Sequence, residues 1–241
     1  MAARPVRIGV LTPSSNTALE PLTSALAAAA GATAHFARFR VTEISLSDEA
    51  LGQFDDRHIL AAAELLADAR VDVIAWSGTS AGWLGFERDQ VLCRRVIERT
   101  GIRATTSVLA LNQALMLGGV TRLGLVTPYA ADVQSRIVEN YRAIGIEIVA
   151  ERHLDIRINH DFALVEPEQL QALVREVATV KPQAVTTFCT NLCAAPLALA
   201  LESELDIPLL DTVSTTVWGA LCAAGADPSC IGGWGRFFQW S

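Results

Sequence analysis

RIGVLTPSSN at residues 7–16 and RLGLVTPYAA at residues 122–131 are two versions of one segment, an apolar run that ends in Thr-Pro and a short turn. Two further pairs follow in the same order: VIAWSGTS at 73–80 with AVTTFCTN at 184–191, and TGIRATTSVLALNQAL at 100–115 with LDIPLLDTVSTTVWGAL at 205–221. The members of the three pairs start 115, 111 and 105 residues apart. Self-similarity at a nearly fixed spacing indicates a duplicated unit, here of about 110 residues.

Each copy alternates short apolar runs with longer segments of helical period, a pattern typical of parallel sheets covered by helices. The predicted strands are 6–11, 34–39, 72–76, 103–105, 122–127, 147–151, 184–188 and 207–210. Eight strands would also fit a (β/α)₈ barrel, but the duplication favours an α/β fold of two pseudo-symmetric Rossmann-like lobes, each with a four-stranded parallel sheet. We expect the first lobe over 1–118, the second over 119–225, and a C-terminal tail over 226–241 that returns toward the first lobe.

The composition limits the partners of this chain. Its 241 residues carry a net charge of −7 and no cluster of Lys or Arg, which argues against nucleic acid, because nucleic-acid affinity depends on neutralising phosphates. No stretch reaches the roughly 20 apolar residues that span a bilayer, and the N-terminus has no leader-like apolar segment. Five cysteines without framework spacing suit reduced thiols, so we expect a cytoplasmic protein. Apolar helix faces permit a homo-oligomer but do not specify one.

Metal and nucleotide motifs are missing from the sequence. The four histidines are scattered, and neither HExxH nor CxxC occurs. No GxGxxG follows the first strand, and no Walker A motif is present. We therefore expect neither a metal nor an organic cofactor.

Polar turns follow the strands at equivalent places in the two copies. They are TPSSNT (12–17), WSGTS (76–80), TPY (127–129) and CTN (189–191). Ligands of open parallel sheets bind beyond the carboxyl ends of the strands. If the two copies face each other, these four turns meet in the cleft between them, which is where we expect the functional site.

Cys189 is the strongest candidate for a catalytic residue. It lies opposite Gly78 of the first copy, so a two-fold site carries a single thiol. Pro196 indicates a helix that starts close behind Cys189, and the free N–H groups of a helix start would stabilise a thiolate. The alternative is a small buried hydrophobe, the usual role of a free cysteine and the one that we expect for the other four.

Hydroxyl and amide side chains occupy the other turns. Thr79 and Ser80 can hold a carboxylate or a developing oxyanion, or they can simply cap a helix. Ser15 and Asn16 leave the same two alternatives open. The phenol of Tyr129 can donate to an anion, and an equally good interpretation is a packed tyrosine.

Two arginines on one strand raise the question of a second carboxylate. Arg38 and Arg40 alternate, so they share a face of the strand. In the cleft they would suit a carboxylate that stays bound. A solvated strand edge is the favoured interpretation.

These motifs resemble the aspartate/glutamate racemase superfamily, in particular the branch that contains maleate cis-trans isomerase and arylmalonate decarboxylase. The resemblance runs from RIGVLTPSSNT to GGWGRFF and covers nearly the whole chain. It implies two pseudo-symmetric lobes with a cofactor-free active site between them. Racemases and isomerases of this superfamily have one cysteine in each lobe. The first would correspond to Gly78 and the second to Cys189.

The resemblance to arylmalonate decarboxylase is carried by Gly78 with the Thr-Ser pair after it, by Tyr129 and by the single Cys189. The PSSNT segment instead resembles maleate isomerase, in which the asparagine that matches Asn16 contacts a substrate carboxylate. A small dicarboxylate is the implied substrate. The residues expected to bind its carboxylate or oxyanion groups are Thr79, Ser80, Tyr129, Thr190, Asn16 and Ser15.

The missing thiol bears on the reaction. Racemisation by proton transfer needs a base on one face of the carbon and an acid on the other, and Gly78 supplies neither. Decarboxylation of a malonate needs only a site that stabilises an enediolate and one acid that protonates it. We therefore expect a cofactor-independent decarboxylase acting on a small malonate-type dicarboxylate, with Cys189 as the proton donor. For that role the pKa of its thiol should not be strongly lowered.

Two alternatives remain open at this point. One is a maleate isomerase-like or Asp/Glu racemase-like enzyme that uses Cys189 with a partner other than cysteine. The other is a non-catalytic carboxylate-binding protein, since loss of a thiol also fits degeneration. A two-thiol variant, Gly78→Cys, is expected to racemise 2-substituted acids.

Overall fold

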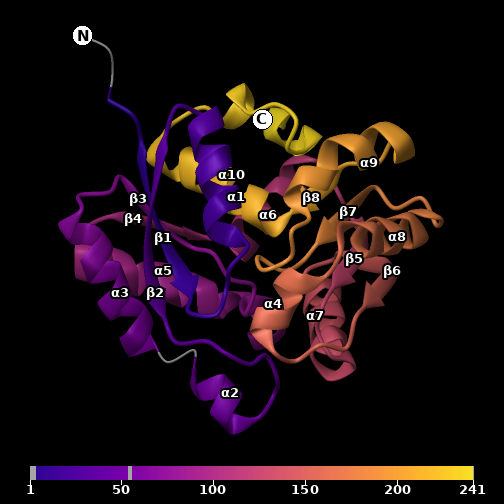
Figure 1. The fold of residues 1–241 in the computed structure, drawn as a ribbon, viewed down its shortest axis with the longest axis horizontal. Coiled ribbons are helices and arrows are strands. Elements are labelled where there is room, and N and C mark those ends of the chain that lie inside the picture. Colours follow the sequence, from indigo (N-terminus) through magenta and orange to yellow (C-terminus); the bar gives the residue numbers. More distant parts are fainter. Residues whose placement is uncertain (1–3, 54–55, 241) are drawn as a thin grey trace.

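The computed structural model describes residues 4–53 and 56–240, and these residues form two four-stranded sheets (Figure 1). All pairs within the sheets are parallel, with the order β2-β1-β3-β4 in the first sheet and β6-β5-β7-β8 in the second. This repeated order confirms the predicted α/β fold class. Residues 1–3 and 241, at the outer ends of the expected first lobe and tail, lie outside the described residues.

The strands form where the apolar runs predict them. The central strands β3 and β7 have every residue buried, which suits the middle of a parallel sheet covered on both faces. The strands are β1 Arg7–Pro13, β2 Thr33–Phe39, β3 Val73–Trp76, β4 Arg103–Thr106, β5 Arg122–Thr127, β6 Glu147–His153, β7 Ala184–Thr187 and β8 Leu209–Asp211.

The long helices also agree with the period of their apolar residues. They are α1 Leu19–Ala29, α3 Asp56–Asp68, α5 Phe86–Thr100, α6 Ser107–Leu117, α7 Ala131–Ala143, α8 Pro167–Ala178, α9 Ala198–Leu205 and α10 Thr212–Ala224. The sequence did not predict α2 (Asp48–Gly52), α4 (Ala81–Leu84) or the 3₁₀ turns, because elements this short carry no recognisable 3.6-residue period. The 3₁₀ turns are η1 Asn159–Leu164, η2 Ala195–Leu197, η3 Pro228–Cys230 and η4 Arg236–Gln239.

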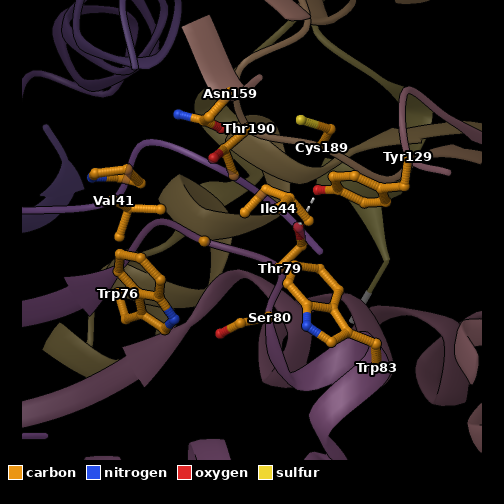
Figure 2. Close-up of a pocket in the computed structure, with 12 residues that line it drawn as sticks. Val41, Ile44, Trp76, Thr79, Ser80, Trp83, Tyr129, Asn159, Cys189 and Thr190 are labelled. Atoms are coloured by element: carbon orange, nitrogen blue, oxygen red, sulfur yellow. Dashed lines mark hydrogen bonds between the residues drawn. The ribbon is translucent and has the colours of Figure 1, made fainter. Parts of the chain in front are cut away.

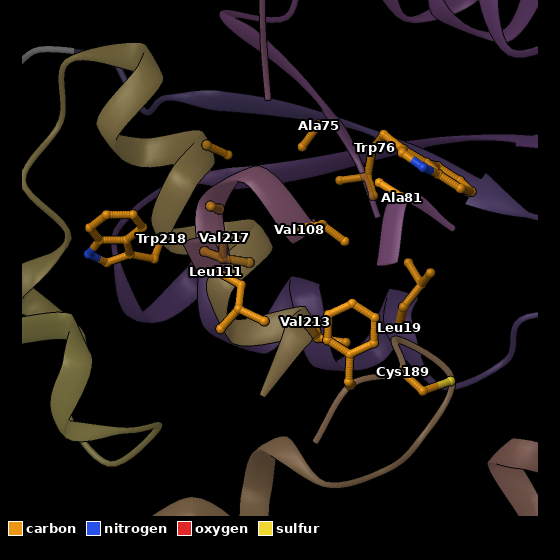
Figure 3. Packing of buried hydrophobic residues seen from close by; sticks show 14 of the residues in the cluster. Leu19, Ala75, Trp76, Ala81, Val108, Leu111, Cys189, Val213, Val217 and Trp218 are labelled. Atoms are coloured by element: carbon orange, nitrogen blue, oxygen red, sulfur yellow. The ribbon is translucent and has the colours of Figure 1, made fainter. Parts of the chain in front are cut away.

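Helix α10 belongs to the second half of the chain but covers the first sheet. Residues 212–221 are all buried, so this stretch has no face exposed to solvent and is packed on every side. It packs against β3, β4, α1 and α6. Figure 3 shows Val213, Val217 and Trp218 of α10 in the same core as Ala75 of β3. A helix from one copy thus completes the core of the other.

The tail after α10, yellow in Figure 1, contacts both halves. The backbone N–H of Arg236 donates to the carboxylate of Glu202 in α9. Phe237 is fully buried and meets the ring of Trp218. Trp240 covers Gly118 beyond α6, where an added Cβ would come within 2.5 Å of the indole.

Candidate active site

The turns after the strands of both halves meet at one small pocket (Figure 2). Its cavity volume of about 20 Å³ leaves room for roughly one water molecule. The lining residues lie at or just after the carboxyl ends of β1, β2, β3, β5, β6 and β7. They are Pro13, Val41, Ile44, Trp76, Gly78, Thr79, Ser80, Trp83, Tyr129, Asn159, Cys189 and Thr190. The two copies therefore face each other across this pocket.

Cys189 lies in the turn after β7, and 2% of its surface is exposed. The pKa of the thiol is raised to about 12, chiefly by burial and to a smaller extent by the carboxylate of Asp211, while a hydrogen bond from Tyr129 partly opposes the shift. The sulfur accepts a hydrogen bond from the N–H of Asn191 at 3.4 Å. The helical segment behind the thiol begins with η2 at Ala195–Leu197, where Pro196 lies in the first turn as predicted, and continues as α9 from Ala198. Its start lies six residues beyond Cys189, so no helix start lies at the thiol. The expectation of a stabilised thiolate is wrong, and the thiol holds its proton, as a proton donor requires.

Tyr129 and Thr79 connect the two halves at the pocket. Their hydroxyl oxygens are 2.6 Å apart, and both side chains are buried. Burial raises the pKa of the Tyr129 phenol well above its usual value, and the neighbouring Cys189 contributes. The phenol is therefore a neutral donor that reaches both Thr79 and the thiol. Figure 2 shows it beside Cys189, with its hydroxyl directed at Thr79.

The equivalent turns 78–80 and 189–191 supply further donors. Thr190 donates its hydroxyl to the carbonyl of Ser77 at 3.1 Å, which ties the two turns together. The Ser80 hydroxyl lines the pocket. Among the described residues, the backbone N–H groups of Thr79, Ser80 and Thr190 find no acceptor. Unpaired N–H groups at a pocket are suited to an anion or an oxyanion.

Ser15 and Asn16 lie beside the pocket and are engaged in other contacts. The Asn16 amide oxygen accepts from the N–H groups of Ala18 and Leu19, so it caps α1, and its Nδ2 donates to Thr190 at 3.3 Å. The Ser15 hydroxyl donates to a backbone carbonyl at 2.6 Å and accepts from Asn159. Neither residue is part of the pocket lining. In this arrangement they hold the first turn in place, and a role in carboxylate binding stays a prediction.

Arg38 and Arg40 are exposed and do not line the pocket. Arg38 pairs with Glu20 at 2.9 Å and donates to the carbonyls of Ser14 and Asn16. It therefore stabilises the TPSSNT turn from outside. This agrees with the favoured interpretation of a solvated strand edge.

Gly78 faces the indole of Trp76. A Cβ added at Gly78 would lie 2.5 Å from Cε2 and Cη2 of that ring, and closer still to Cζ2. Trp76 is almost fully buried and also packs on Phe39, with ring centroids 5.0 Å apart. The space that a second thiol would need is filled by an aromatic ring.

Several lining residues were missed by the sequence reasoning. Val41 and Ile44 follow the carboxyl end of β2, and Asn159 comes after β6, so the rule that located the other turns could have found these segments. They were overlooked because none of the four duplicated turns follows β2 or β6. Trp76 and Trp83 gave no local signal, since a buried tryptophan is an ordinary core residue.

No group of three or more His, Cys, Asp or Glu side chains is placed to hold a metal ion among residues 4–53 and 56–240. None of the helices in these ranges combines the length and apolar character that a bilayer crossing requires.

Comparison with known proteins places the chain among enzymes. The model of the arylmalonate decarboxylase family matches residues 8–238. A maleate isomerase from Geobacillus stearothermophilus is 26% identical over 231 residues, 91% of this chain and 92% of that protein. An arylmalonate decarboxylase from Bordetella bronchiseptica is 26% identical over 170 residues, 69% of this chain and 71% of that protein.

Solved structures agree with this result. The maleate isomerase Iso from Pseudomonas putida superposes with a TM-score of 0.88 at 26% identity, over 97% of this chain and 98% of that one. A crystal structure of arylmalonate decarboxylase gives a TM-score of 0.77 at 21% identity, over 98% and 100% of the two chains. The second similarity, at this low identity, is evidence for the shared fold alone.

Proposed function

Because the chain belongs to the arylmalonate decarboxylase family, we propose that it is a cofactor-independent decarboxylase of a small malonate-type dicarboxylate. The observation that carries the proposal is the asymmetry of the pocket. Cys189 lies on one side, while Gly78 and the indole of Trp76 occupy the place of a second thiol. One acid is enough to protonate an enediolate, whereas racemisation needs proton-transfer groups on both faces.

The pocket as it stands has room for about one water molecule, so in the proposed reaction it opens to admit the substrate. The retained carboxylate is then bound by donors of the facing turns, which come from Thr79, Ser80, Tyr129 and Thr190. The bond between the α-carbon and the second carboxylate breaks, its electron pair forms an enediolate with the retained carboxylate, and CO₂ leaves. A donor aimed at developing negative charge is typically worth about 3–4 kcal/mol in the transition state. The departing carboxylate lies against the apolar Val41 and Ile44, where its charge is poorly solvated.

Cys189 then gives its proton to the α-carbon, and water reprotonates the resulting thiolate. The raised pKa, about 12, keeps the thiol protonated at neutral pH before this step. Because the one thiol of the pocket lining lies on one side, the proton reaches a single face of the α-carbon.

A maleate isomerase-like activity is the second candidate, and a specific observation favours it. The maleate isomerase relatives match more of this chain than the decarboxylase relative does, 91% against 69% for the pair above. A cysteine variant of the Pseudomonas putida enzyme was solved with maleate. A nucleophilic role for Cys189 would need a thiolate, and the raised pKa of its thiol argues for the acid role instead.

The test is proton NMR in D₂O with a panel of malonates, maleate and amino dicarboxylates. Wild type is compared with Cys189→Ala and Cys189→Ser in the same assay. Cys193→Ala is the matched control, because Cys193 lies outside the pocket lining. We expect loss of one carboxyl group and entry of deuterium at one face of the α-carbon. Removing the acid should lower the rate by about 10²–10⁴-fold, while the control keeps the wild-type rate.

Other outcomes would assign other functions. Cis-trans conversion of maleate without loss of carbon would make the protein an isomerase and reject the decarboxylase. Stabilisation by a dicarboxylate without turnover, unchanged in Cys189→Ala, would make it a carboxylate-binding protein.

A further inference from the structure

Trp76 stands between two cavities. On one side is the small active-site pocket of about 20 Å³, and on the other is a cavity of about 150 Å³. Trp76 and Ser80 line both. The larger cavity lies under α3, α4 and α5, with Ile59, Leu84 and Leu92 among its apolar walls. The indole is thus a partition between a pocket with little free volume and a larger cavity, which Arg88, Asp89 and Arg95 also line.

The same indole excludes any side chain at residue 78. Gly78 has an ordinary backbone conformation, outside the left-handed region that only glycine tolerates. A side chain there is therefore prevented by the ring of Trp76 and not by backbone strain. The ring and a residue-78 side chain compete for one volume.

We propose that Trp76 is the specificity-determining residue of this pocket: it takes the place of the second thiol and limits the substituent on the reacting carbon to a small group such as hydrogen or methyl. This inference rests on the proposed function for the identity of the substrate. Figure 2 shows Trp76 and Cys189 on opposite sides of the pocket, so a substituent that points away from the thiol meets the indole. Removing the ring joins the pocket to the larger cavity and admits an aryl group.

The first arm of the test measures stability and needs no substrate. Gly78→Ala should lower Tm by about 4–10 °C, because its Cβ overpacks against the indole. Trp76→Leu frees that space, so the Tm loss of the Trp76→Leu/Gly78→Ala double variant should be clearly smaller than the sum of the two single losses. Trp83→Leu is the matched control. It shortens the other tryptophan of the pocket and should not rescue Gly78→Ala. Additive losses in the first pair would overturn the proposal.

The second arm measures substrate size. Wild type and Trp76→Leu are given methylmalonate and phenylmalonate, and turnover is followed by NMR while ligand binding is followed by the Tm shift. We expect wild type to prefer methylmalonate and Trp76→Leu to change the preference by at least about tenfold toward phenylmalonate, as expected for loss of a steric block. Equal preference in both proteins would overturn the proposal.

The two readouts separate this inference from the proposed function. If no malonate is consumed but the binding preference changes in Trp76→Leu, the size role stands and the decarboxylase fails. If malonates are consumed with unchanged preference, the decarboxylase stands and the size role fails. Racemisation gives a further check. The sequence alone led us to expect it from Gly78→Cys, but because the indole fills the space of the new side chain, α-proton exchange should require Trp76→Leu together with Gly78→Cys. Exchange by Gly78→Cys alone, at wild-type Tm, would show that the indole blocks nothing.

Discussion

The two tyrosines of this chain are both buried, and they differ in what their hydroxyls contact. The Tyr129 hydroxyl meets Thr79 at 2.6 Å and reaches Cys189, whereas the Tyr141 hydroxyl has no hydrogen-bond partner among the described residues. At the scale of single residues, Tyr129 is thus a hydrogen-bond donor at the pocket, whereas Tyr141 contributes packing alone.

We predict that Tyr129→Phe lowers kcat by about 10²–10³-fold, because an aimed donor is lost from the enediolate site. It should also cost about 1 kcal/mol of unfolding free energy, since Thr79 loses its partner. Tyr141→Phe, the matched control, should leave kcat unchanged and stability unchanged or slightly higher. The measurements are steady-state kinetics and urea unfolding. Equal effects of the two substitutions on kcat would contradict the assigned role of Tyr129.

At the scale of elements, the start of α10 depends on a buried carboxyl group. Asp211 accepts hydrogen bonds from the N–H groups of Val213 and Ser214 and from the hydroxyl of Thr187. Burial raises its pKa to about 7, and the three hydrogen bonds only partly oppose this. The cap therefore joins the start of α10 to β7 of the second sheet, and it carries a cost when Asp211 ionises.

The raised pKa gives a prediction with a definite sign. Burial makes the folded state favour the protonated form of Asp211. The stability associated with that protonated carboxyl is fully present below about pH 4 and is lost as the pH rises through about 7. Asp211→Asn keeps a capping oxygen without the charge. The difference in unfolding free energy, Asp211→Asn minus wild type, should therefore increase by about 2–4 kcal/mol from pH 4 to pH 8. A difference that does not vary with pH in urea unfolding would contradict this.

Asp211→Ala is the companion variant. It removes the charge and the cap together, so it should lose about 1–2 kcal/mol relative to Asp211→Asn at every pH. Asp89, whose pKa burial also raises to about 7, is present in all three proteins and does not affect the comparison.

At the scale of the whole molecule, the two halves are joined at the turn that carries Cys189. The Asn191 amide oxygen accepts from the N–H groups of Thr17 and Ala18 of the first half at 3.0 and 3.1 Å. Its Nδ2 donates to the carbonyl of Asn159. One buried side chain, two residues after Cys189, therefore fixes the turn to the start of α1.

We predict that Asn191→Ala lowers the unfolding free energy by about 2–4 kcal/mol, because buried N–H and carbonyl groups lose their partners. Turnover should also fall, since the Cys189 turn loses its anchor. Asn112→Ala is the matched control: the Asn112 amide oxygen is buried without a partner in the described residues, so its removal should cost less than about 1 kcal/mol. Urea unfolding and kcat are the measurements. Similar costs for both would mean that Asn191 does not join the halves.

Much of the fold could be predicted because it is recorded in consecutive residues. The apolar runs of β1 and β5, the repeated Thr-Pro turns and the helical period between strands are local patterns. Backbone geometry converts such patterns into strands and helices of known direction. The candidate site could be predicted as far as strand ends allow, which is why Thr79, Tyr129 and Cys189 were named and indeed line one pocket.

The sequence by itself determined a duplicated α/β chain with one thiol at the end of β7 and glycine at the equivalent place after β3. Only the tertiary structure decided that Trp76 fills the space beside Gly78, that α10 covers the sheet of the other half, and that Cys189 is buried with a raised pKa. Local patterns fix the direction of a strand and the face of a helix. Which volume a side chain fills, and how much water reaches a thiol, depend on contacts between residues far apart in the chain, and these exist only once the two halves have packed.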